Sequence, residues 1–178
     1  LLTLGTGVGG GIIVDGKILT GAHGAGGEIG HIHVEDQIEE HCGCGNQGCL
    51  EQFASATGIA RLARVALAES EEASLLREGE VTAKAVFDAL KEGDELAKRV
   101  VERFGKYLGT AISVMAGILD PEVIVIGGGV SKAGWILLDY IRKYYKPYAY
   151  KSSKDTEFAL AQLGNDAGIY GCAKLILD

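Results

Sequence analysis

Hydrophobic side chains recur at helical spacing most clearly between Asp94 and Leu119. Leu96, Val100, Phe104, Leu108, Ile112 and Met115 lie three or four residues apart, which predicts one long amphipathic helix. No charged residue occurs between Lys106 and Asp120. We therefore expect the second half of this helix to be buried on all sides.

Shorter elements flank this helix and set the fold class. Helices are predicted over 50–70 with a break at Thr57-Gly58, over 82–92 between a Thr82 cap and Gly93, over 131–145 and over 166–177. Strands are predicted over 1–4, 123–126 and 157–163, and Asp15-Gly16 predicts the turn of a hairpin over 10–19. A hairpin followed by alternating helices and strands predicts a layered α/β fold.

Composition and charge narrow the class of protein. The chain has 178 residues, 47% of them hydrophobic, which fits one packed domain. Its net charge of −7 argues against a nucleic-acid surface, and no apolar run reaches the roughly 18 residues of a membrane span. We expect a cytoplasmic protein. The chain opens inside the apolar run Leu1-Leu2-Thr3-Leu4, so we also expect further sequence upstream.

Three of the four cysteines cluster within eight residues. His31, Cys42, Cys44 and Cys49 could supply the four nitrogen and sulfur donors of a structural Zn²⁺ site, and the glycines between the thiols would let the sulfurs converge. His33 and His41 compete with His31 as the fourth ligand. A disulfide with a spare thiol, or cysteines without metal, are the alternatives. Cys172, in the apolar C-terminal segment, is interpreted as a small core residue.

Two glycine-rich turns are candidate nucleotide sites. Gly5-Thr6-Gly7-Val8-Gly9-Gly10 satisfies G-x-G-x-x-G, but a strand rather than a helix is predicted to follow, which disfavours a dinucleotide fingerprint. Its backbone N–H groups could still bind phosphate. Gly127-Gly128-Gly129 follows a predicted strand and opens a predicted helix. The alternatives are a plain hairpin connection and a strand–helix turn capped by Ser131.

Acidic residues flank the cysteine cluster on both sides. Glu28 and Glu51 lie next to the candidate metal ligands, and carboxylates accept strong hydrogen bonds from sugar hydroxyls. A metal-bound His31 would keep one ring nitrogen for a ligand. Ordinary surface or capping roles for Glu28 and Glu51 are the alternative.

Several of these motifs, in this order, resemble one known family. Gly27-Glu28-Ile29-Gly30-His31 followed by Cys42-Gly43-Cys44-Gly45-Asn46-Gln47-Gly48-Cys49-Leu50-Glu51 resembles the paired signature of the ROK family of repressors, open reading frames and sugar kinases. The Gly5–Gly11 turn, Val125-Ile126-Gly127-Gly128-Gly129 and Leu163-Gly164-Asn165-Asp166-Ala167-Gly168 are also similar to family motifs. Within the family, the segment 21–27 is most similar to that of glucokinases.

The resemblance implies a fold, a reaction and a site. It implies an actin/hexokinase-like (ribonuclease H-like) fold, with residues 1–178 forming a single C-terminal lobe and the N-terminal lobe absent. Glu28, His31 and Glu51 would bind glucose or a related hexose, and His31, Cys42, Cys44 and Cys49 would bind structural Zn²⁺. Gly5, Thr6 and Gly7 would face the phosphates of ATP, present with Mg²⁺, and Gly127, Gly128 and Gly129 would lie by its adenosine.

The resemblance also limits what this chain could do alone. The family's catalytic Asp belongs to an upstream motif that Asn165-Asp166 does not match, so we expect no sugar phosphorylation by the isolated chain. A homodimer or larger assembly is implied. The rival interpretations are a sugar-responsive ROK transcriptional repressor, a kinase for N-acetylmannosamine or fructose, and, least favoured, a dinucleotide dehydrogenase.

Overall fold

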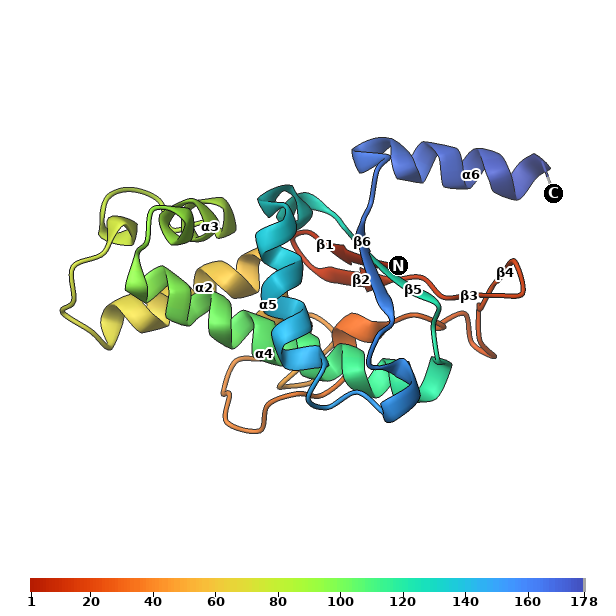
Figure 1. Ribbon diagram of the computed structural model, residues 1–178, viewed down its shortest axis with the longest axis horizontal. Coiled ribbons are helices and arrows are strands. Elements are labelled where there is room, and N and C mark those ends of the chain that lie inside the picture. Colours follow the sequence, from red (N-terminus) through yellow and green to blue (C-terminus); the bar gives the residue numbers. More distant parts are fainter. Residues whose placement is uncertain (178) are drawn as a thin grey trace.

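A four-stranded mixed sheet forms the centre of the fold (Figure 1). The computed structural model describes the backbone of residues 1–177 and their side chains except those of residues 165, 175 and 177. The strands are β1 (Leu2–Leu4), β2 (Val8–Gly10), β5 (Val123–Gly127) and β6 (Glu157–Leu160), in the order β2-β1-β5-β6. β2 is antiparallel to β1, whereas β1, β5 and β6 are parallel. The α/β prediction is thus confirmed, with β6 shorter than predicted.

A separate two-stranded hairpin extends beyond the sheet. It consists of β3 (Ile13–Val14) and β4 (Lys17–Ile18), which pair antiparallel. Asp15 and Gly16 have φ angles of 51° and 75°, the left-handed conformation that a tight hairpin turn requires and that Asp-Gly favours. The predicted hairpin turn is confirmed.

Helices supply most of the remaining structure. The α-helices are α1 (Glu51–Ala54), α2 (Ala56–Ala68), α3 (Ala83–Lys91), α4 (Glu95–Leu119), α5 (Trp135–Tyr145) and α6 (Ala167–Leu177). The 3-10 turns are η1 (Ile29–His31), η2 (Leu75–Arg77), η3 (Gly129–Ala133), η4 (Lys151–Ser153) and η5 (Gly164–Asp166). The predicted ends of α3 are confirmed, because the Thr82 hydroxyl accepts a hydrogen bond from Ala85 N and Gly93 has a φ of 85°.

The long helix α4 contributes many buried side chains to the hydrophobic core, but part of its surface is exposed. It packs against α1, α2, α3 and α5, and Val100, Phe104 and Leu108 are fully buried. The expectation that its second half is buried all round is wrong, because Val114 is 58% and Ile118 77% exposed. An uncharged helix surface indicates burial only if another element covers it, and among the described residues no helix or strand covers this face.

Two predicted helix boundaries are also wrong. The break in the helical segment 50–70 lies at Ser55, which is extended and accepts a hydrogen bond from Gly58 N through its hydroxyl. Gly58 lies inside α2, where a Cβ would come within 2.8 Å of Gln52 O. The predicted helix 131–145 begins at Trp135, because Gly134, with a φ of 85°, separates it from η3.

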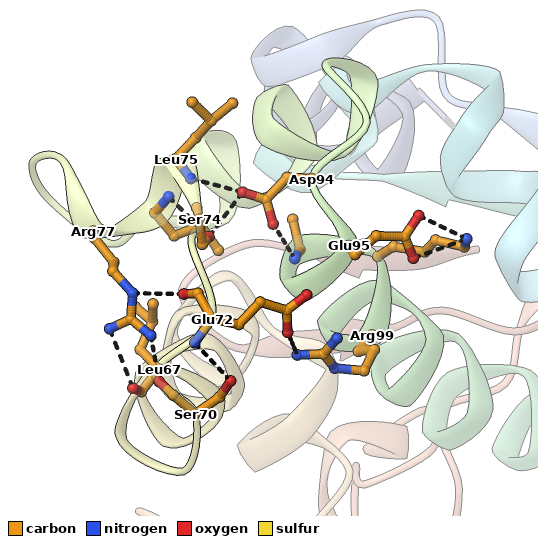
Figure 2. Close-up of polar contacts among 12 residues, drawn as sticks. Leu67, Ser70, Glu72, Ser74, Leu75, Arg77, Asp94, Glu95 and Arg99 are labelled. Atoms are coloured by element: carbon orange, nitrogen blue, oxygen red, sulfur yellow. Dashed lines mark hydrogen bonds and ion pairs between the residues drawn. The ribbon is translucent and has the colours of Figure 1, made fainter.

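Hydrogen bonds made by two charged side chains, Arg77 and Asp94, fix the acidic connector between α2 and α3, residues 69–82 (Figure 2). The Arg77 guanidinium donates to the carbonyl oxygens of Leu67, Ser70 and Glu72, where α2 ends and the connector begins. The Asp94 carboxylate caps α4 by accepting from Ala97 N, and it also accepts from Leu75 N and the Ser74 hydroxyl. These contacts fix a segment that has few apolar side chains of its own.

The C-terminal helix α6 extends away from the body of the molecule (Figure 1). Ile169, Tyr170 and Ile176 are 71%, 61% and 85% exposed. Cys172 is exposed as well, so its interpretation as a core residue is wrong, because the helix that carries it extends away from the core (Figure 1). Among the described residues no helix is long and apolar enough to span a membrane.

Candidate functional site

The structure brings one histidine and three cysteines together in front of α1. The ligand atoms of His31, Cys42, Cys44 and Cys49 all lie within 4.8 Å of one another. The Cys44 and Cys49 sulfurs are 3.6 Å apart, and the Cys42 sulfur is 3.6 Å from His31 Nδ1. A tetrahedral Zn²⁺ site with bonds of about 2.0–2.3 Å has ligand–ligand distances of about 3.5–3.8 Å. The spacing and the soft donors therefore fit zinc.

The other two histidines of this region use their rings elsewhere. His33 lies within hydrogen-bond distance of the Asp36 carboxylate, at 2.8 Å, and of Gln47 O, at 3.0 Å. His41 Nδ1 lies 3.2 Å from Gly45 O. The choice among three histidines that the sequence left open is therefore made by the geometry, which places only His31 in the group of four.

Backbone contacts hold the cysteine loop against the segment that carries His31. Val34 N donates to Gly48 O, and Leu50 N donates to Ile32 O, at 2.7 and 2.9 Å. Gly48 has a φ of 74°, and a Cβ on it would lie 1.9 Å from Glu35 O, so only glycine fits there. Gly45 has a φ of 92°, which also favours glycine, whereas Gly43 has open space around it and no contact there requires glycine.

Two thiols of the cluster, those of Cys44 and Cys49, have pKa values shifted in opposite directions. Burial, together with hydrogen bonds to the thiols of Cys44 and Cys42, raises the pKa of Cys49 to about 12. The backbone N–H of Asn46 lowers the pKa of the exposed Cys44 below its usual value. Neighbouring thiolates repel one another, and a bound cation offsets this repulsion and deprotonates coordinating thiols.

Two carboxylates lie at the cluster, one beside the His31 ring and one beside the Cys42 sulfur. His31 Nε2, the ring nitrogen remote from Cys42, lies 3.9 Å from the exposed Glu28 carboxylate. Glu51 Oε1 lies 3.7 Å from the Cys42 sulfur, and Glu51 Oε2 accepts from Val8 N at 2.9 Å. Glu28, His31 and Glu51 therefore all lie at the Cys–His cluster, and their role in binding sugar stays a prediction.

Close backbone approaches place this group directly on β2. A Cβ on Gly10 would lie 2.5 Å from Gly27 O, and a Cβ on Gly30 would lie 2.2 Å from Val8 O. A Cβ on Gly7 would lie 2.1 Å from the Glu51 carboxylate. The glycines of the first glycine-rich motif thus allow the segment 27–31 and the Glu51 side chain to touch the strand.

The two glycine-rich turns meet at the carboxyl ends of β1 and β5. Gly128 has a φ of 84°, and a Cβ on it would lie 2.5 Å from Leu4 O. In the first turn, Gly5 N donates to Gly7 O and the Thr57 hydroxyl donates to Thr6 O, while the Thr6 side chain is exposed. Gly127–Gly129 opens the 3-10 turn η3 rather than the predicted helix, and Ser131 donates its hydroxyl to Gly128 O instead of capping a helix.

A cavity that the sequence did not indicate lies beside the second turn. It has a volume of about 330 Å³ and lies between α3 and η3, with Gly129 and Val130 on one wall and Phe87 on the other. Lys84, Lys91 and Lys132 also line it. The helical spacing of Lys84, Phe87 and Lys91 on α3 was the available signal, but nothing in the sequence placed α3 against η3.

Comparison with known proteins assigns the family. The sequence profile of the ROK family matches residues 1–178. The chain belongs to the ROK family. It is 50% identical to a glucokinase from Halalkalibacterium halodurans over 99% of the chain and 55% of that relative. It is 36% identical to the DNA-binding transcriptional dual regulator NagC of Escherichia coli over 85% of the chain and 37% of that protein.

Solved ROK structures share the fold. A ROK family glucokinase from Streptomyces griseus, in complex with glucose and AMPPNP, superposes with a TM-score of 0.84 at 35% identity. The match covers 98% of this chain and 58% of that one. The ROK chain described here therefore has the actin/hexokinase-like α/β fold of these kinases. It spans a little over half the length of the glucokinases it matches.

Proposed function

We propose that this chain is the sugar- and nucleotide-binding C-terminal lobe of an ATP-dependent glucokinase. The observation that carries the proposal is the gathering of Glu28, His31 and Glu51 at a Cys–His cluster beside two glycine-rich turns. The likeness to a glucokinase at 50% identity supports the reaction class. In this assignment Glu28, His31 and Glu51 bind the hydroxyls of glucose.

Each part of the site has a separate role in this proposal. Gly5, Thr6 and Gly7 face the phosphates of ATP, which is bound with Mg²⁺. Gly127, Gly128 and Gly129 lie by the adenosine, and the adjoining cavity between α3 and η3, about 330 Å³ in volume, has room for a base. Gly128 packs against Leu4, which directly precedes the first turn, so both turns can contact the same nucleotide.

The metal in this proposal is structural. His31, Cys42, Cys44 and Cys49 hold Zn²⁺ with all four positions filled, which leaves no open position for substrate. With the metal bound, these four ligands would keep the loop 42–49 closed and the His31 ring fixed, so that Nε2 would face the sugar together with Glu28. We expect a chelator that removes zinc to loosen this loop and abolish sugar binding; full sugar affinity after metal removal would contradict this role.

The remaining chemistry lies in an N-terminal lobe. Phosphoryl transfer requires a base that takes the proton from the sugar 6-hydroxyl as its oxygen attacks the γ-phosphorus. The resemblance to the ROK kinases assigns that base to an Asp of the other lobe, and positioning by both sides of the cleft would bring it to the sugar. The exposed apolar residues of α6, Ile169 and Ile176 among them, provide a surface on which that lobe can pack.

A coupled assay of glucose-6-phosphate formation tests the assignment. We expect the full-length protein to phosphorylate glucose faster than fructose or N-acetylmannosamine, and the 178-residue chain to show no turnover. Glu51→Gln should raise the KM for glucose, whereas Glu78→Gln, on the exposed connector, should not. A full-length protein that binds sugar and DNA but never consumes ATP would favour the rival repressor function.

A further inference from the structure

Two cysteines of the cluster form a close pair whose sulfurs differ in accessibility. The Cys44 and Cys49 sulfurs are 3.6 Å apart, and both residues are free thiols. Cys44 is exposed, whereas Cys49 is buried with only 1% of its surface accessible. A disulfide bond has a length of about 2.05 Å, so the two sulfurs need to approach by about 1.5 Å to form one. A small shift of one side chain and its backbone is enough for that.

The third cysteine of the cluster is less well placed for a disulfide. The Cys42 sulfur lies 3.6 Å from His31 Nδ1 and 3.7 Å from Glu51 Oε1, and the residue is buried. Only Gly43 separates Cys42 from Cys44, and so short a loop does not readily take up the geometry that a disulfide requires. Cys44 and Cys49 are therefore the pair best placed to bond.

The backbone around Cys44 leaves room for this approach. Cys44 lies between Gly43 and Gly45, and a Cβ on either glycine would meet no atom within 4 Å. Cys49, by contrast, is held in place, because its backbone N–H donates to Gln52 Oε1 at 3.0 Å and its sulfur lies 3.7 Å from His31 O. Cys44 can therefore move toward Cys49 without a collision.

We propose that Cys44 and Cys49 are a site of reversible oxidation, at which a peroxide converts them to a disulfide. The Cys44 thiolate attacks the peroxide, whose O–O bond breaks; one oxygen stays on sulfur as a sulfenic acid, and the other leaves and takes up a proton from solvent. The Cys49 thiolate then attacks the Cys44 sulfur and expels hydroxide. The two thiolates lose two electrons and the peroxide gains them, so the step needs no other reactant.

Accessibility decides which sulfur reacts first. A peroxide reaches the exposed Cys44 from solvent, whereas the protein covers Cys49. Reversible oxidation of cysteine typically combines an accessible thiol with a second, resolving cysteine next to it. Because Cys49 is only 3.6 Å away, it can trap the sulfenic acid before a second peroxide oxidises Cys44 irreversibly.

The disulfide and the proposed metal site exclude each other. Cysteine binds a metal as the thiolate, so a disulfide between Cys44 and Cys49 removes two of the four donors. His31 and Cys42 alone do not hold the ion or close the loop, and the His31 ring loses its fixed position beside Glu28. This consequence for sugar binding rests on the proposed function, whereas the pairing of the two sulfurs depends only on their geometry.

Hydrogen peroxide added to the full-length protein tests the proposal. A chromogenic chelator follows the zinc released, mass spectrometry of peptides locates any disulfide, and calorimetry measures glucose affinity before and after treatment. We expect zinc release together with a Cys44–Cys49 link that lowers the mass by about 2 Da. Glucose affinity should fall by about 10-fold or more, because the ligands that orient His31 are lost. Dithiothreitol with added zinc should restore both metal and affinity.

Two variants serve as controls. Cys172→Ser removes an exposed cysteine outside the cluster and should respond to peroxide as the wild type does. Cys44→Asp keeps a possible metal ligand that peroxide does not oxidise, so it should retain its zinc under the same treatment. If Cys44→Asp binds no zinc, the location of the disulfide in the wild type decides.

Three results would overturn the proposal: a Cys44 thiol that stays unmodified in peroxide, a disulfide that joins Cys42 or two separate chains, and a Cys44 oxidation that dithiothreitol does not reverse. A purified protein without zinc would contradict the metal site of the proposed function but not this inference. The reduced, metal-free protein can still be treated with peroxide. A Cys44–Cys49 link formed there supports the inference, and its absence overturns it.

Discussion

Gly7 offers a sharp test of how the first glycine-rich turn supports the sugar site. A Cβ on Gly7 would lie 2.1 Å from Glu51 Oε2, closer than real Cβ contacts come. The atom it meets is the end of a flexible side chain, so in Gly7→Ala the carboxylate must move by roughly 1 Å. That movement breaks the hydrogen bond from Val8 N to Glu51 Oε2, which is 2.9 Å long.

The size of the effect follows from that bond. A hydrogen bond to a charged group contributes about 1.5–3 kcal/mol, which corresponds to about 10- to 100-fold in affinity if Glu51 must be held in place to bind sugar. Stability should fall by about 1–2 kcal/mol, because the same hydrogen bond is lost from the folded chain and the smaller loss of chain entropy on folding of alanine offsets only part of it. We therefore expect weaker glucose binding in a protein that remains folded.

Calorimetric titration of glucose into the full-length protein, without nucleotide, measures this directly. Gly5→Ala is the matched control, because Gly5 belongs to the same turn but a Cβ on it would meet nothing within 4 Å. Gly7→Ala should lose affinity and Gly5→Ala should not. Equal affinities in the two variants would refute the link between Gly7, Glu51 and the sugar.

Three further predictions concern the stability of the fold. Asp94→Ala should lower the free energy of unfolding by about 2–4 kcal/mol in urea titrations, because it removes the α4 cap and leaves Leu75 N and the Ser74 hydroxyl without their acceptor. Burial raises the pKa of Asp94, but hydrogen bonds from Ala97, Ser74 and Leu75 outweigh it and hold the pKa below the usual value. The contribution of the Asp94 carboxylate to folding stability is therefore present above about pH 4 and lost as the pH falls through the lowered pKa. The difference in free energy of unfolding between wild type and Asp94→Asn should accordingly narrow in acid. A difference that does not change with pH would contradict this. Gly105→Ala should cost about 1–3 kcal/mol by thermal or urea unfolding, because its Cβ would lie 2.8 Å from Tyr140 O and push α5 away.

Sequence patterns predicted the elements well where local chemistry decides. Thr82 and Gly93 mark the ends of α3, and Asp15-Gly16 forms the hairpin turn, because each uses a conformation or a cap that its own residues supply. At Thr57-Gly58 the same reasoning failed. Gly58 is needed for close packing on Gln52 O rather than for a break, and Ser55 supplies the cap instead.

The sequence did not predict how the helices pack against the rest of the molecule. The apolar second half of α4 and the apolar residues of α6 predicted burial, yet Ile118 and Ile176 are exposed in the single chain. An apolar helix face indicates that another surface covers it, but the sequence does not show whether that surface belongs to the same chain. Glu28, His31 and Glu51 flank one loop, so the sequence alone indicates that they lie close together, whereas the cavity beside Phe87 depends on how α3 meets η3.

The proposed sugar site depends most on a metal ion held by one imidazole and three sulfurs. Elemental analysis combined with X-ray absorption at the zinc edge, on protein purified without added metal, measures this most directly. We predict one zinc per chain with three sulfur neighbours at about 2.3 Å and one nitrogen at about 2.0 Å, and loss of the metal in Cys49→Ser. Protein without a transition metal, or zinc surrounded by oxygen, would contradict the proposed site.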